Sequence, residues 1–208
     1  MLVIIQARLS SKRFKNKVMK LVYGKPLIWY VLKSVKKSKK IKKIIVSTSQ
    51  NKSDDKLVVY LKKNNVDFFR GSLTNVAKRL TETAKIHKAK QFMRISGDSP
   101  FIDHRIIDKS IKINSSLNYK YDLITNVFPR TFPSGMSVEI VKTKTLEKMI
   151  KNFSKFDKEH VTTYLYKNYK KFKIKNFKTM KKTNIKYSID KPSDIKKLKF
   201  LFKNFLST

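Results

Sequence analysis

Residues 2–17 read LVIIQARLSSKRFKNK, a short apolar run that passes directly into a basic loop. The run Leu2–Gln6 is rich in β-branched residues and too short for a helix, which predicts an interior strand of a parallel sheet. The loop after the first parallel strand is where open α/β sheets usually bind ligands. Its cations at positions 8, 12, 13, 15 and 17 and the hydroxyls of Ser10 and Ser11 suit a polyphosphate. The alternative is an ordinary solvated loop in a basic protein.

The composition is typical of a single soluble domain. A chain of 208 residues with 40% hydrophobic residues is long enough to bury a sizeable core. It has no cysteine, which excludes disulfides and thiolate metal sites, and its three histidines are too scattered to predict a zinc cluster. No apolar run approaches the roughly 18 residues of a membrane span, and the N-terminus lacks a signal-peptide pattern. We therefore expect a cytoplasmic protein with no membrane contact.

The formal net charge of +36 predicts that the protein attracts anions. One alternative function is therefore a basic nucleic-acid-binding protein, with tight and strongly salt-dependent binding. The lysines are spread along the whole chain, and no known nucleic-acid motif is present. The dense run at residues 36–43 joins a predicted helix to a predicted strand, where cations near a helix end are favoured anyway. Nucleic-acid binding is accordingly the weakest of the hypotheses.

Strand-like and helix-like segments alternate through the first 126 residues. This alternation predicts a mostly parallel sheet flanked by helices on both faces. The predicted strands cover residues 2–6, 44–48, 67–70, 92–95 and 122–126, and predicted helices begin near Pro26, Ser53, Asn75 and Asp103.

The regular alternation of strand-like and helix-like segments ends in the second half, which predicts some antiparallel pairing. About residues 127–180 we expect a small α/β lid or dimerisation element within one domain. Its predicted elements are a Pro-rich loop at 128–135, a strand at 138–141, helices from Thr143 and near Glu159, and strands at 172–177 and 187–190; a terminal helix then carries Ile195, Leu198, Phe202 and Phe205.

Two aspartates lie at the ends of predicted strands, where they can bind a metal. Asp98 follows Gly97 and a predicted buried strand, and Mg²⁺ prefers one or two carboxylates together with phosphate oxygens. The alternative for Asp98 is a helix cap or the partner of an arginine. Asp190 ends the last predicted strand and can share a metal with Asp98 if the strands are neighbours. As Pro192 follows closely, a plain N-cap is the stronger alternative there.

Two further segments can contact a polar substrate. Glu159 and His160 lie next to each other near a predicted helix start, although a lone histidine is more often structural or exposed. Arg130 lies in the Pro-rich loop, where it can clamp a carboxylate or simply belong to a turn.

Seven stretches in a fixed order carry a resemblance that covers nearly the whole chain: IIQARLSSKRFKNKV, GKPLIWYVL, FFRGSLTNVAKR, RISGDSPFID, NVFPRTFPSGMSVEI, EHVT and YSIDKPSDI. Together they resemble the cytidylyltransferase family. The most similar subgroup is that of the spore-coat polysaccharide biosynthesis protein SpsF. The acylneuraminate and 3-deoxy-manno-octulosonate cytidylyltransferases are more distant relatives.

The resemblance implies a Rossmann-like nucleotidyltransferase fold over residues 1–208, a Mg²⁺ cofactor and a homodimer. It also implies transfer of CMP from CTP to a sugar acid, with release of pyrophosphate, for surface polysaccharide or glycan biosynthesis. An enzyme alternative is a glycosyltransferase, which would bind an intact nucleotide sugar and release no pyrophosphate.

The resemblance assigns site residues by position. Arg8, Lys17 and Asp98 are the implied catalytic residues, and Asp98 and Asp190 the implied metal ligands. The implied nucleotide-binding residues are Arg8, Ser10, Ser11, Arg13, Lys17, Arg70, Gly71, Val76, Arg79 and Gly97. The implied substrate-binding residues are Arg130, Glu139, Glu159 and His160.

The chain departs from the family pattern in its basic loop. Relatives usually have glycine near position 10 and Pro-Gly at 15–16, where this chain has Ser10, Lys15 and Asn16. Asparagine tolerates the left-handed conformation better than most residues, so we expect Asn16 to replace the glycine. Asn75 and Lys78 also stand where relatives often have acidic residues.

Overall fold

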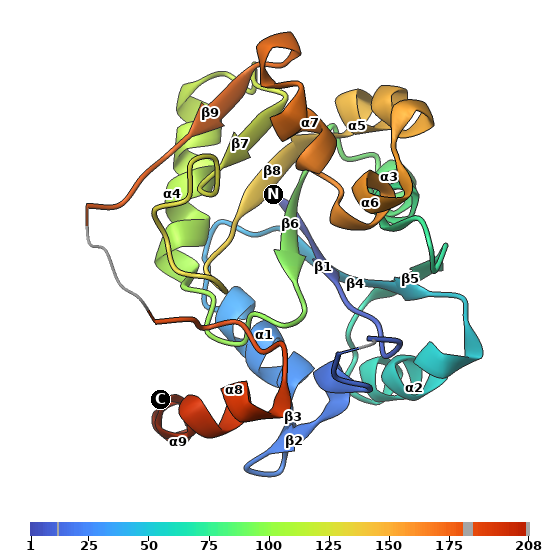
Figure 1. The fold of residues 1–208 in the computed structure, drawn as a ribbon, viewed down its shortest axis with the longest axis vertical. Helices are drawn as coiled ribbons and strands as arrows, with labels where there is room; N and C mark the ends of the chain where they lie inside the picture. Colours follow the sequence, from blue (N-terminus) through green and yellow to red (C-terminus); the bar gives the residue numbers. More distant parts are fainter. Residues whose placement is uncertain (12, 181–184, 207–208) are drawn as a thin grey trace.

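A computed structural model describes residues 1–11, 13–180 and 185–206 (Figure 1); Lys12 of the basic loop lies outside the described residues. The described residues form a seven-stranded sheet in the order β5-β4-β1-β6-β8-β7-β9. The strands are β1 (Leu2–Gln6), β4 (Lys43–Ser49), β5 (Phe68–Gly71), β6 (Gln91–Ser96), β7 (Leu123–Thr125), β8 (Glu139–Lys142) and β9 (Ile174–Asn176). A separate small hairpin pairs β2 (Leu21–Val22) with β3 (Lys25–Pro26).

The first strand lies at the centre of the sheet, as its apolar sequence predicts. β1 pairs in parallel with β4 on one side and β6 on the other, and Ile4 lies opposite Ile45 and Arg94. Among the described strands of this sheet, β8 alone runs antiparallel to its neighbours, β6 and β7. The carboxyl ends of β5, β4, β1 and β6 therefore meet at one edge.

Helices cover both faces of the sheet (Figure 1). Because side chains alternate along a strand, Val3 and Ile5 pack into one core and Leu2 and Ile4 into the other. The first core includes residues of α1 (Leu27–Lys36), α2 (Asp55–Lys63) and α4 (His104–Ser116). The second includes residues of α3 (Val76–Ile86), α5 (Thr143–Met149) and α7 (Thr163–Lys167) and lies beside α6 (Lys155–His160), which contacts α3.

The C-terminal segment packs beside α1 and the β2–β3 hairpin, as Figure 1 shows. The predicted single terminal helix is two helices, α8 (Pro192–Lys197) and α9 (Lys199–Leu206). Phe202 is fully buried in a third core with Tyr30 of α1, and its ring centroid lies 4.5 Å from that of Phe101. This packing brings the segment before α8 to the carboxyl edge of the sheet.

The mostly parallel sheet flanked by helices is confirmed, and so is antiparallel pairing in the second half. β7, β8 and β9 extend the main sheet, and a lid, sugar-side or dimerisation role of residues 127–180 stays a prediction. Three local predictions are wrong. Residues 187–190 form an irregular loop, the helix expected near Glu159 begins at Lys155 after the cap Ser154, and Ser53 lies in a short 3₁₀ turn before α2.

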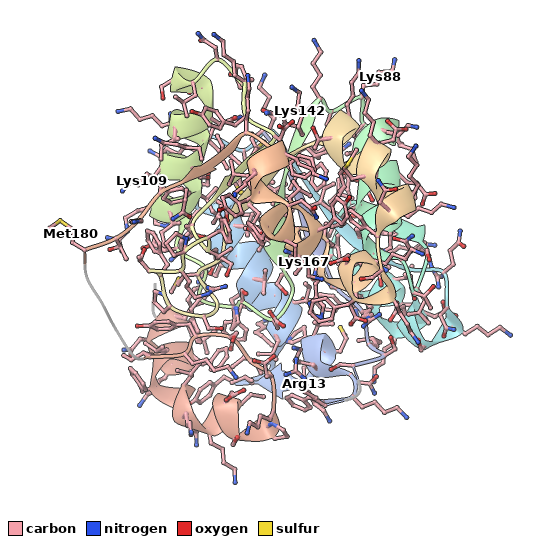
Figure 2. The ribbon with its side chains drawn as sticks, turned by 45° about the horizontal axis from the view of Figure 1, so that its top comes forward. Arg13, Lys88, Lys109, Lys142, Lys167 and Met180 are labelled. Carbon is pink, nitrogen blue, oxygen red and sulfur yellow. The ribbon has the colours of Figure 1, made fainter. Side chains whose placement is uncertain are left out.

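The cationic side chains project from many elements. Figure 2 shows Lys109 of α4 at the left of the molecule, Lys88 after α3 at the upper right and Lys142 of β8 between them. The positive charge is therefore spread over the surface. No helix in the described part of the chain is both long enough and apolar enough to cross a membrane.

Candidate active site

The basic loop is held against the carboxyl edge of the sheet by its backbone. Ala7 N donates to Ser47 O at 3.1 Å, and Asn16 N donates to Leu9 O at 3.0 Å, which closes the loop on itself. Asn16 adopts the left-handed conformation with φ of 58°, which is the conformation expected of a residue that stands in for glycine. Ser10 and Ser11 lie in the same loop and are both partly exposed.

A buried carboxylate pins this loop to the end of β4. Asp54 is fully buried, and its Oδ1 accepts a hydrogen bond of 2.7 Å from Leu9 N. Its Oδ2 accepts from Thr48 Oγ1 at 3.0 Å, from Ser49 N at 3.0 Å and from Ser49 Oγ. An ionised carboxylate can only accept hydrogen bonds and these four groups all donate, so each of its four hydrogen bonds has the required direction. Asp54 was not predicted from the sequence, since an aspartate before a helix has the pattern of a cap.

Lys17 brings the two candidate metal ligands together. Its Nζ lies 2.8 Å from Asp98 Oδ2 and 3.7 Å from Asp190 Oδ1, and its side chain is only 10% exposed. Ile189 N donates to Asp98 O at 2.9 Å, which joins the two backbone segments. Arg13, on the surface, lies 3.5 Å from Asp190 Oδ1. The structure thus gathers four predicted site residues, although Asp190 comes from a loop and not from the expected strand.

The ionisation of Asp190 follows from these neighbours. Burial raises its pKa, but the hydrogen bond from Lys186 and the charges of Lys17 and Arg13 outweigh burial and hold the pKa below its usual value. The carboxylate is therefore charged at neutral pH. Lys186 was not identified from the sequence, where it is one lysine among many.

Gly97 allows β1 and β6 to approach closely where they end. A Cβ at this position would lie 3.0 Å from both Ala7 Cβ and Gln6 O, closer than most such contacts. Gly97 N also donates to Gln6 O at 2.9 Å. Glycine here places Asp98 directly beside the basic loop.

Arg8 connects the basic loop to two other elements. One end of its guanidinium group donates to Leu73 O at 3.1 Å, and the other forms an ion pair with Glu159 of α6. Glu159 therefore lies beside the first arginine of the basic loop. His160 is exposed and lines the neighbouring cleft, and burial together with nearby arginines lowers its pKa despite the opposing charge of Glu159.

Residues 70–79 run from the end of β5 into α3. Arg70 donates to Ser49 O at 2.9 Å and pairs with Asp55 at 2.7 Å. A Cβ on Gly71 would lie 2.9 Å from Arg79 Cγ, so this arginine packs directly on the glycine. Arg79 is 1% exposed, and burial and the charge of Arg8 lower its pKa to about 10. Val76 is also buried, so its predicted contact with a nucleotide can come only from its backbone.

A cleft of about 380 Å³ lies next to the carboxylate pair. Its lining residues are Arg94, Ser96, Asp98, Ser99, Val127, Arg130, Ser134, Gly135, Ser137, Glu139, His160, Thr162, Thr163, Tyr166, Ser188 and Asp190. It therefore adjoins the predicted metal ligands and contains three of the four predicted substrate-binding residues.

Two oppositely charged side chains in the lining of this cleft, Glu139 and Arg94, form an ion pair. Glu139 is 3% exposed and pairs with Arg94, and it also accepts hydrogen bonds from Thr162 Oγ1 at 2.7 Å and from Tyr166. Burial and the charge of Glu139 raise the pKa of Tyr166, which keeps its hydroxyl protonated as a donor. Glu139 is thus a buried, fully hydrogen-bonded part of the cleft lining.

Arg130 is different, because it is exposed and donates to Ser137 Oγ at 3.0 Å. Within the described residues its guanidinium group has no carboxylate within 4.0 Å. It can therefore offer two parallel N–H donors to an incoming carboxylate.

The carboxylate pair fits a magnesium ion. The described residues contain no cluster of three or more histidine, cysteine or acidic side chains able to hold a metal by themselves. Asp98 and Asp190 supply two carboxylates around one cationic group, and Mg²⁺ is commonly bound by one or two carboxylates with substrate phosphates. The donor set matches a metal that arrives with a nucleotide.

Three curated proteins resemble this chain. An uncharacterised protein of Methanocaldococcus jannaschii is 34% identical over 97% of this chain and 83% of its own length. The spore coat polysaccharide biosynthesis protein SpsF of Bacillus subtilis is 29% identical over 79% of this chain and 69% of its own. The 3-deoxy-manno-octulosonate cytidylyltransferase of Chlorobaculum tepidum is 30% identical, over 61% of this chain and half of its own length.

Two solved structures resemble the fold. A cytidylyltransferase from Leptospira borgpetersenii superposes with a TM-score of 0.92 and 30% identity, covering 98% of this chain and 87% of that chain. A CMP:2-keto-3-deoxy-manno-octonic acid synthetase, solved in complex with CTP, superposes with a TM-score of 0.74 over 98% of both chains, and its 15% identity shows the fold alone. The family model described as cytidylyltransferase matches residues 2–206. The chain therefore belongs to the cytidylyltransferase family, as a nucleotidyltransferase with a Rossmann-like fold.

Proposed function

We propose that this enzyme transfers CMP from CTP to a hydroxyl group of a sugar acid, with Mg²⁺, and releases pyrophosphate. The observation that carries the proposal is the group formed by Lys17, Asp98 and Asp190 at the carboxyl edge of the sheet. Lys17 Nζ lies within 4 Å of both carboxylates, and the cleft beside them is large enough for an acceptor.

The basic loop is suited to the triphosphate. In nucleotidyl transfer the acceptor hydroxyl attacks the α-phosphorus, and negative charge increases on the nonbridging and leaving oxygens. Catalysis therefore depends mainly on positioning and on fixed positive charge. Arg8 and Lys17 supply that charge from a loop that Asp54 and the left-handed Asn16 already hold in place. Little reorganisation is then needed when the nucleotide binds.

Asp98 and Asp190 would hold the Mg²⁺ ion. When bound, the metal supplies charge neutralisation at the phosphate oxygens. Lys17 stands between the same two carboxylates, so it can contact the phosphate groups that the ion accompanies.

The cleft suits an anionic sugar. Arg130 has a guanidinium group available for a carboxylate, and the serine hydroxyls of the lining can bind sugar hydroxyls. Two relatives support this acceptor class and a role in surface polysaccharide synthesis: one is a 3-deoxy-manno-octulosonate cytidylyltransferase and the other a spore coat polysaccharide biosynthesis protein. A homodimer and a cytoplasmic location are also expected, and sedimentation analysis would test the first.

The test is pyrophosphate release from CTP in the presence of a panel of sugar acids. Each acid is paired with the matching sugar in which a hydroxymethyl group replaces the carboxylate. We expect release with at least one acid and at least about tenfold less with its neutral partner, since a charged pair of this kind contributes more than 1.4 kcal/mol.

The variant Arg130→Gln should raise the KM of the acid and leave the KM of CTP unchanged. Equal turnover of acid and neutral sugar would contradict the sugar-acid assignment. Consumption of an intact nucleotide sugar without pyrophosphate release would instead identify a glycosyltransferase.

A further inference from the structure

Asp190 lies on an irregular loop, so the sheet does not hold its side chain in place. Two backbone hydrogen bonds fix the loop itself: Tyr187 N donates to Ser134 O at 2.8 Å, and Ile189 N donates to Asp98 O at 2.9 Å. Neither of them determines the direction of the Asp190 carboxylate. Something else must hold it towards Asp98.

Lys186 and Asp194 hold this carboxylate from the protein side. Lys186 Nζ lies 2.7 Å from Asp190 Oδ2 and 3.0 Å from Asp194 Oδ2. Asp194, in the first turn of α8, also accepts hydrogen bonds from Asp190 N at 2.7 Å and Lys191 N at 3.0 Å. The lysine therefore bridges the candidate metal ligand to a buried carboxylate that is fixed at a helix start.

The two oxygens of Asp190 have different surroundings. Oδ2 is occupied by Lys186, with Ser188 Oγ 3.4 Å away. Oδ1 is turned towards the site, where it lies 3.7 Å from Lys17 Nζ and 3.5 Å from Arg13. One oxygen is thus used for support, and the other is directed to the substrate side.

We propose that Lys186 is a positioning residue for nucleotidyl transfer, which with Asp194 keeps Asp190 Oδ1 directed at the metal that accompanies the nucleotide. This inference rests on the proposed function. Groups that orient a metal ligand from behind typically change metal affinity or activity by about 10- to 100-fold when they are removed.

A purely electrostatic role for Lys186 predicts the opposite result. A cation next to a metal ligand repels the metal, so its removal would tighten metal binding. The Lys186 side chain is 38% exposed, and solvent and salt therefore weaken this repulsion. Weaker metal binding after removal of Lys186 therefore indicates that it positions Asp190, and tighter binding indicates that it only repels the metal.

The experiment measures Mn²⁺ binding to the protein with CTP, from the loss of the free Mn²⁺ signal in electron paramagnetic resonance beyond the loss that CTP alone causes. We expect Lys186→Met to weaken Mn²⁺ binding and to lower kcat by about 10- to 100-fold. Lys186→Arg, which keeps the charge and the donors, should restore both to within a few-fold of wild type. Lys196→Met is the matched control, because Lys196 is exposed on α8 and lies outside the site.

Unchanged or tighter Mn²⁺ binding in Lys186→Met would overturn the inference. Circular dichroism checks that each variant is folded, and Lys186→Gln replaces Lys186→Met if the latter does not fold. Measurements on the wild-type protein distinguish failure of the proposed function from failure of the positioning role. If it neither binds Mn²⁺ with CTP nor releases pyrophosphate, the proposed function fails, whereas normal wild-type results with an unaffected Lys186→Met refute the positioning role alone.

Discussion

Replacing Asp54 with asparagine should damage both the stability of the protein and its basic loop. In the variant, the amide oxygen can still accept from Leu9 N. The NH₂ group, however, then faces the three groups that donate to Asp54 Oδ2 in the wild type. The hydroxyls of Thr48 and Ser49 can rotate to accept, whereas Ser49 N–H cannot. One charge-assisted hydrogen bond is lost, at about 1.5–3 kcal/mol, and one buried donor is left without a partner, at about 1–3 kcal/mol. We therefore expect the free energy of unfolding to fall by about 3–5 kcal/mol.

Urea unfolding followed by circular dichroism measures this loss, and steady-state kinetics measures the effect on the loop. The KM of CTP should rise at least about tenfold, because 1.4 kcal/mol of lost pre-organisation corresponds to a factor of ten. Asp67→Asn is the control, as this residue is 63% exposed and its ion pair with Lys43 should contribute less than about 1 kcal/mol. An Asp54→Asn protein within 1 kcal/mol of wild type, with an unchanged KM of CTP, would refute this reasoning.

Three other changes test separate parts of the structure. Lys17→Ala should lower kcat by about 10²–10³-fold, and turnover near the wild-type rate would exclude Lys17 from catalysis. Burial raises the pKa of Asp157, but hydrogen bonds from Ser154, Thr163 and Lys167 hold this pKa at about 2. Its stabilising contribution is therefore present above the unfolded pKa of about 3.9 and is lost as the pH falls through 2. Asp157→Asn should be about 1–2 kcal/mol less stable at pH 7 in urea unfolding, with a difference that shrinks below pH 4. Gly135→Ala should lower the melting temperature and kcat, since its φ is +90° and a Cβ would lie 2.5 Å from Ser188 N, next to the carboxylate pair. Gly24→Ala, with φ of +73° and nothing within 4 Å, should show only the roughly 1–2 kcal/mol strain of the left-handed conformation.

Local signals in the sequence predicted much of this fold. The run Leu2–Gln6 is the central strand because its residues suit a surface buried on both faces. Asn75 and Asp103 each accept a hydrogen bond at the start of a helix, as their residue types indicate. Asn16 is left-handed because its side chain tolerates that conformation. In each case the cause lies within a few residues of the effect.

The elements that were mispredicted depend on contacts between distant segments. Residues 187–190 alternate like a strand, but the backbone N–H groups of this segment donate to Ser134, Asp98 and Asp194 and not to a neighbouring strand. Asp54 acquires its role only when the basic loop folds over the end of β4, which brings Leu9 to Asp54 from 45 residues away in sequence. Lys186 could not be distinguished among 50 basic residues until α8 placed Asp194 beside it.

The most direct test of nucleotidyl transfer from CTP is calorimetric binding of CTP, UTP, GTP and ATP with Mg²⁺ at moderate salt. We predict a clear preference for CTP that is lost in Asp98→Asn, because this carboxylate lies 2.8 Å from Lys17 at the centre of the site. Equal, weak and salt-sensitive binding of all four nucleotides would contradict the account and would reduce the basic loop to an electrostatic patch.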